Sequence, residues 1–198
     1  LRDKLNKSDL SKKLKIATSG PRRKAQLLGI NSGLKIVPIR GNIQTRIDKM
    51  TTENLDGLIV AKAALNRLKI SHPNIYIFSQ EEMLPAAAQG AIGIEVIEEN
   101  LEAETINLLQ SINDNLTFKA TEIERTVVAA LQGNCLSPIS ALCKISDQDV
   151  ELKVRVSNQK GSEVYDQKEI FKLDNKIEAL EGFIEKLISN GAKTLIQK

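Results

Sequence analysis

Residues 15–23, which read KIATSGPRR, predict a short strand that passes through a polar loop into a helix. Pro21 falls at the first helical position, where its missing N–H leaves no helical hydrogen bond unmade. Gly29 marks the expected end of that helix. This strand–loop–helix unit indicates an α/β fold, and the rest of the first ninety residues repeats it.

Further strands and helices are expected in alternation at 34–39, 43–50, 58–61, 63–68 and 75–78. Such alternation is typical of a mostly parallel sheet with helices on both faces, which is a doubly wound domain. The following residues predict a strand at 90–97 and helices at 98–113 and 117–131.

The pattern changes after residue 132, where three strands are expected at 139–145, 149–156 and 163–171, followed by a helix at 175–190. Apolar residues in the middle strand alternate with charged ones, which predicts a sheet with one buried face. The apolar positions are Val150, Leu152, Val154 and Val156. The sequence therefore indicates a small α+β domain with a three-stranded sheet.

Composition narrows the function classes. The 198 residues are 41% hydrophobic and 27% charged, which is usual for a folded globular protein. A single histidine, His72, excludes a metal site built from several histidines, and 3% aromatic residues without Trp poorly suit a base-stacking nucleic-acid surface. Basic residues outnumber acidic ones up to residue 90, and the reverse holds beyond it. This asymmetry favours an anionic ligand in the first half.

Two loops hold most of the arginines of the first half. TSGPRR (18–23) offers hydroxyls, helix-start N–H groups and two guanidinium groups, all of which favour anions. The alternative reading is an ordinary helix N-cap with surface arginines. RGNIQTR (40–46) follows the next strand, so both loops should meet at one sheet edge, with Lys62 and Arg67 nearby. The planar guanidinium group of arginine can bind carboxylates or phosphates, so these residues do not show which of the two anions is bound.

The two cysteines predict different environments. Cys135 sits in the tight loop GNCLSPI (133–139), where small turn residues should leave the thiol accessible for covalent attachment. Cys143 lies inside an apolar strand, where a free cysteine acts as a small buried hydrophobe.

The motifs TSGPRR, IRGNIQTR, AALNR, LPAAAQGAIGIE and GNCLSPI, in this order, resemble the porphobilinogen deaminase (hydroxymethylbilane synthase) family from about Lys15 onward. The resemblance implies a periplasmic-binding-protein-like fold. It also implies head-to-tail condensation of four porphobilinogen molecules, with loss of ammonia, on a dipyrromethane cofactor. The product is hydroxymethylbilane, a precursor of tetrapyrroles and haem.

The resemblance also assigns residues. Cys135 would carry dipyrromethane through a thioether. The expected cofactor-binding residues are Thr18, Ser19, Arg22, Arg23, Arg40, Gly41, Asn42 and Arg46. Porphobilinogen would be bound by Arg40, Arg46, Arg67 and Gln89. Residues 1–90 would be most of the family's second domain, 91–112 a return segment of its first domain, and 113–198 the C-terminal domain.

Some expectations concern departures from the family. Its catalytic aspartate lies in an N-terminal segment that these residues do not match, so the chain is expected to be a fragment with little turnover alone. Gly20, Pro21, Gln44, Lys62 and Asn134 replace residues usual in the family, and Gln44 and Lys62 are expected to narrow or recharge the site. The alternative function is a non-catalytic polyanion-binding module or a diverged inactive relative. A cytoplasmic monomer without metal, membrane or nucleic-acid partners is expected.

Overall fold

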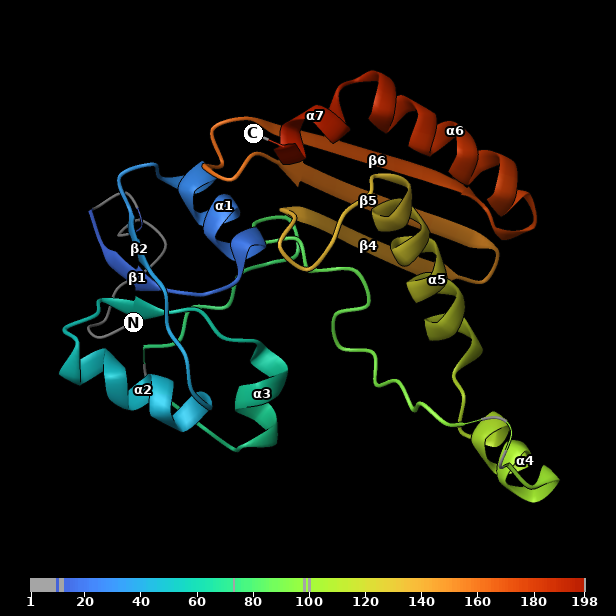
Figure 1. The fold of residues 1–198 in the computed structure, drawn as a ribbon, viewed down its shortest axis with the longest axis horizontal. Helices are drawn as coiled ribbons and strands as arrows, with labels where there is room; N and C mark the ends of the chain where they lie inside the picture. The colour runs from blue at the N-terminus through green and yellow to red at the C-terminus, as the bar shows by residue number, and fades with distance from the viewer. Residues whose placement is uncertain (1–9, 11–12, 73, 98, 100, 198) are drawn as a thin grey trace.

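The computed structural model describes residues 10, 13–72, 74–97, 99 and 101–197. They form two three-stranded sheets, one parallel with strand order β2-β1-β3 and one antiparallel with order β4-β5-β6 (Figure 1). Helices in the described ranges include none that is long and apolar enough to cross a membrane.

The parallel sheet confirms the α/β prediction for the first half. Its elements are β1 (Lys15–Ala17), α1 (Pro21–Ile30), β2 (Lys35–Val37), α2 (Ile43–Thr52), β3 (Gly57–Leu58) and α3 (Lys62–Arg67). β1 is the central strand and pairs in parallel with both neighbours, so its buried Ile16 and Ala17 anchor the core. Parallel strands that each run into a helix place the loops after β1 and β2 at one sheet edge, as predicted.

Two predicted strands are not strands in the structure. Residues 75–78 run without ladder pairing, and instead Tyr76 and Phe78 meet edge to face with ring centroids 5.0 Å apart. Residues 90–97 are also outside any strand, and Ile92 is 84% exposed. An apolar segment forms a strand only when a neighbour accepts its backbone hydrogen bonds, and no described strand pairs with either segment. The first sheet is therefore narrower than predicted, and a periplasmic-binding-protein-like architecture does not follow from it.

The second half follows the predicted order closely. Its elements are α4 (Ala103–Ser111), α5 (Asn115–Ala130), β4 (Ile139–Ser146), β5 (Asp149–Ser157), β6 (Val164–Lys172), the 3-10 turn η3 (Leu173–Asn175), α6 (Lys176–Ser189) and α7 (Ala192–Gln197). The four alternating residues of β5 are buried against side chains of α5 and α6, among them Val127 and Phe183. Because α5, α6 and α7 cover that face of the sheet, the predicted one-sided burial is confirmed (Figure 1).

Buried polar side chains join the two halves. Gln26 of α1 donates from Nε2 to the carbonyl of Leu84 (2.9 Å) and to Oγ of Ser140 in β4 (3.2 Å). Glu124 of α5 accepts the amide N–H of Ala88 (2.5 Å) and that of Cys143 in β4 (2.7 Å). Segment 84–88 is therefore bonded both to the first helix and to the second half of the chain.

The turn between β5 and β6 packs directly on α1. Gly161 there has φ of +66°, which glycine adopts without the strain that other residues incur. A Cβ at Gly161 would collide with the carbonyl oxygen of Ala25 and approach the amide nitrogen of Gly29 to 2.8 Å. The close approach of the two halves at this point therefore requires glycine.

We expect Gly161→Ala to lower the free energy of unfolding by about 1–3 kcal/mol, because it adds both a clash and backbone strain. Urea unfolding followed by circular dichroism measures this. Gly182→Ala is the matched control, since a Cβ at that position of α6 meets nothing within 4 Å. That substitution should be neutral or stabilise by up to about 1 kcal/mol through helix propensity. Identical midpoints for Gly161→Ala and the wild-type chain would contradict the packing described.

Candidate functional site

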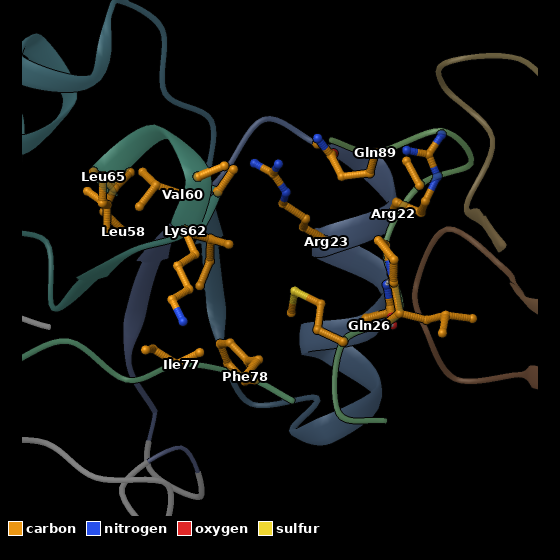
Figure 2. A pocket seen from close by; sticks show the side chains of 18 of the residues that line it. Arg22, Arg23, Gln26, Leu58, Val60, Lys62, Leu65, Ile77, Phe78 and Gln89 are labelled. Atoms are coloured by element: carbon orange, nitrogen blue, oxygen red, sulfur yellow. Dashed lines mark hydrogen bonds between the residues drawn. The ribbon is translucent and has the colours of Figure 1, made fainter. Parts of the chain in front are cut away.

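A cavity of about 620 Å³ lies between α1, the start of α3 and the segment 75–90 (Figure 2). Its walls are mostly apolar and include Leu58, Val60, Ile77 and Phe78. This volume and this lining are typical of a small-molecule site. The charged residues of the described lining are Arg22, Arg23 and Lys62, and no carboxylate is among them.

The loop after β1 positions the two arginines. Gly20 occupies the N-cap of α1 and makes no side-chain cap, and Pro21 is the first helical residue. Ser19 does not cap the helix, because its Oγ donates to the carbonyl of Ile39 (2.5 Å) and accepts the Ile39 N–H (2.8 Å). Thr18 is buried and its Oγ1 accepts the Gly20 N–H at 3.4 Å. The Ser19 hydroxyl ties the loop to Ile39, just after β2, and the Thr18 hydroxyl bonds within the loop, so an ordinary side-chain N-cap does not explain the motif.

Burial makes the arginine pair electrostatically unusual. Burial lowers the pKa of Arg22, and the positive charge of neighbouring Arg23 lowers it further, whereas nearby Cys135 raises it. Burial also lowers the pKa of Arg23, with a further contribution from Arg46. Nε of Arg22 is buried and has no hydrogen-bond partner among the described residues. A buried donor left unpaired is costly, so an anion that accepts its hydrogen bond would be held strongly.

The second basic loop lies beside this cavity rather than in its lining. Asn42 caps α2 by accepting the Thr45 N–H (2.8 Å), and Gly41 has φ of +122°. Arg46 donates from Nε to the carbonyl of Gly41 (2.7 Å) and is close enough to Arg23 to affect its pKa. Arg40 is exposed, and neither it nor Arg46 is among the lining residues.

Cys135 is exposed and lines the cavity, as its loop predicted. The loop is shaped by Asn134, whose Oδ1 accepts the Leu136 N–H (2.8 Å) and whose own N–H donates to Oγ of Ser137 (3.0 Å). Gln132, which lies just before this loop, adopts the left-handed backbone conformation, with φ of 57°. Cys143 is buried in the β4 core, and desolvation together with Glu124 raises its pKa to about 12.

Gln89 and Gly90 contribute to the rim of the cavity, and Gln89 is exposed. They follow Ala88, which is held in the left-handed region (φ 57°) while its N–H is bonded to Glu124. Burial raises the pKa of Glu124, and its two backbone hydrogen bonds oppose that shift. Arg67, at the last position of α3, lies outside the lining.

Sequence reasoning missed the supporting residues Gln26 and Glu124. Gln26 had a visible signal, because it stands between the apolar residues Ala25 and Leu27 of the expected helix, whereas Glu124 lies among polar neighbours such as Glu122 and Arg125 and gave none. The apolar wall at Ile77 and Phe78 was also missed, because that segment was assigned to a strand.

The site therefore combines an accessible thiol, a desolvated arginine pair and an apolar wall. These groups suit an aromatic polycarboxylate attached through sulfur. The exposed Cys135 beside the unpaired Nε of Arg22 is what a covalently bound dipyrromethane with carboxylate side chains would require.

Comparisons with known proteins agree with this chemistry. Residues 1–105 match the family model described as "Porphobilinogen deaminase, dipyromethane cofactor binding domain", and residues 118–182 match the one described as "Porphobilinogen deaminase, C-terminal domain". Among curated relatives, the porphobilinogen deaminase of Campylobacter jejuni subsp. doylei is 35% identical over 96% of this chain and 61% of the relative. That of Clostridium botulinum (strain 657 / Type Ba4) is 45% identical over 73% of this chain and 49% of the relative.

The chain thus spans at most about 61% of the length of these relatives. The two family models together cover most of its residues, including both arginine loops and the Cys135 loop. The chain belongs to the porphobilinogen deaminase family.

Proposed function

We propose that this chain supplies the cofactor-holding and carboxylate-binding part of a hydroxymethylbilane synthase, which condenses four porphobilinogen molecules with loss of ammonia. The observation that carries the proposal is that the thiol of Cys135 and the guanidinium groups of Arg22 and Arg23 border one cavity. Each pyrrole unit bears an acetate and a propionate, so the growing chain is a polycarboxylate. A cationic cavity with a thiol at its edge is suited to hold it.

The residues would divide the work by position. Dipyrromethane bound to Cys135 supplies the pyrrole end to which new units are joined. Arg22 and Arg23 bind its carboxylates, and Phe78 packs against pyrrole rings and excludes water. Thr18 and Ser19 hold the arginine loop in place through the hydrogen bonds given above. Such prepositioned donors orient the reacting units and so lower the entropic part of the barrier.

The second arginine loop would serve later pyrrole units. Arg46 lies near Arg23, so Arg40, Gly41, Asn42 and Arg46 extend the basic surface beyond the cavity. Gln89 lies at the rim, where an incoming porphobilinogen would meet the bound chain. Arg67 would contact porphobilinogen only outside the described lining, and its assignment rests on the resemblance alone.

We further propose the domain division 1–90, 91–112 and 113–198, with 91–112 packing on a separate domain of the full-length family fold. Its support is the exposed apolar side chains of that segment, including Ile92, Ile94 and Ile97. The described cavity lining has no carboxylate, so the acid–base group of the reaction would come from outside that lining. We take the full protein to be a cytoplasmic monomer that acts on free porphobilinogen.

The deciding experiment is cofactor loading. Incubation of the chain with hydroxymethylbilane should add the mass of linked pyrrole units, measured on the intact protein and mapped to Cys135. Cys135→Ser should take up nothing, whereas the matched control Cys143→Ser should load normally. Equal adduct formation by Cys135→Ser would refute the attachment site. A folded wild-type chain that takes up no adduct would favour the non-catalytic anion-binding alternative.

The two thiols should differ in reactivity. Iodoacetamide at pH 8 is expected to alkylate Cys135 alone, because burial raises the pKa of Cys143 to about 12 and keeps that thiol protonated and inaccessible. Intact mass should therefore show one added group in the native chain and two in urea. Rapid double labelling of the native chain would contradict the burial of Cys143.

Removal of an arginine should weaken the site. We expect Arg23→Leu to reduce the affinity for porphobilinogen by about tenfold, the scale of one hydrogen-bonded charge contact. Isothermal titration calorimetry measures this, with Arg125→Leu as control, since Arg125 is exposed on α5 and does not line the cavity. Equal affinities for the two variants would argue against carboxylate binding by α1.

A further inference from the structure

Lys62 is the third cation of the cavity, and it comes from the wall opposite α1. It is the first residue of α3, it is exposed, and in Figure 2 its side chain extends from α3 toward Ile77 and Phe78. Arg23 projects from α1 and lines the same cavity. Cations on the α1 wall and on the α3 wall therefore border one cavity of about 620 Å³.

Nothing described in the protein neutralises Lys62. The ion pairs of the described residues do not include it, and no carboxylate lines the cavity with it. The rest of the lining near Lys62 is apolar, with Ile77 and Phe78 beside its side chain and Leu58 and Val60 under α3. Such an apolar floor accepts a flat ring, and the cations on either side accept anionic groups that point in different directions.

The helix geometry separates Lys62 from Arg67. The two cations are five residues apart on α3, which places their side chains about 140° apart around the helix axis. Consistent with this, Lys62 lines the cavity and Arg67 does not. Of the two cations on α3, Lys62 is therefore the one that borders the cavity.

We propose that Lys62 binds a second carboxylate of the pyrrole ligand, opposite the carboxylate held by Arg23, so that the cavity selects dicarboxylate over monocarboxylate pyrroles. This inference rests on the proposed function and deepens it. Lys62 is thus a specificity-determining residue: it recognises the spacing of two anionic groups across one ring.

The test compares two probes by isothermal titration calorimetry, in a Cys135→Ser background so that no covalent adduct forms. Porphobilinogen carries two carboxylates, and 3-(1H-pyrrol-3-yl)propanoic acid carries one. Lys62→Met should weaken porphobilinogen binding by about tenfold and leave the affinity for the monocarboxylate unchanged. Lys62→Arg should retain most of the affinity for porphobilinogen, and Lys24→Met, at an exposed lysine of α1 outside the lining, should change neither affinity.

The outcomes separate this inference from the proposed function. Porphobilinogen binding that Lys62→Met leaves unchanged overturns the inference while the proposed function stands. An equal loss for both probes, or the same loss in Lys24→Met, also overturns it, because general electrostatic attraction then accounts for the effect. If the parent protein binds neither probe, the proposed carboxylate cavity falls and the inference falls with it.

Discussion

The site depends on how one short segment satisfies its buried backbone. The carbonyl and N–H of Leu84 are both bonded to the amide of Gln26, and the N–H of Ala88 is bonded to Glu124. A buried group left unpaired costs about 1–3 kcal/mol, so the segment has few alternative positions. Through it, α1 with its arginines and α5, which leads to the Cys135 loop, are fixed to the same few residues. The distance between thiol and arginines is therefore set by the interior of the protein.

This rigid support explains how the cavity tolerates unneutralised cations. Gln26 also accepts a hydrogen bond from Nη1 of Arg155 (3.0 Å), and Arg155 is paired with Asp166 on the outer face of the second sheet (2.7 Å). The cations near α1 thus fall into two groups: Arg155 is balanced within the fold, whereas Arg22 and Arg23 lack any described carboxylate partner. Desolvated donors held in place before binding interact with an anion more strongly than exposed ones do.

Local sequence patterns predicted those helices, strands and side-chain exposures that depend mainly on neighbouring residues. The strands β4, β5 and β6 were predicted in their observed order, β5 from its alternating residues, and β1 with α1 was predicted from the apolar start and Pro21. The exposure of Cys135 and the burial of Cys143 were predicted correctly, because a tight loop exposes a side chain and an apolar strand buries it. Strand status failed at 75–78 and 90–97, since pairing depends on a neighbour and not on the segment itself. Gln26 and Glu124 were missed because their hydrogen-bond partners are distant in the sequence. The partners of Gln26 lie 58 and 114 residues away, and those of Glu124 lie 36 and 19 residues away. The sequence prediction placed both Lys62 and Arg67 near the basic loops, although their five-residue spacing puts them on different sides of α3 and only Lys62 lines the cavity.

The proposed covalent attachment at Cys135 would change what the cationic residues must achieve. A tethered ligand would stay in the cavity at high effective concentration, so no single carboxylate contact would have to supply the affinity. Contacts that are individually modest could then release one unit and take up the next as the proposed pyrrole chain lengthens. Cations spread over α1, α3 and the neighbouring α2 loop suit that task better than one tight cluster would. In this fold the thiol would retain the ligand, and the dispersed positive charge would orient it.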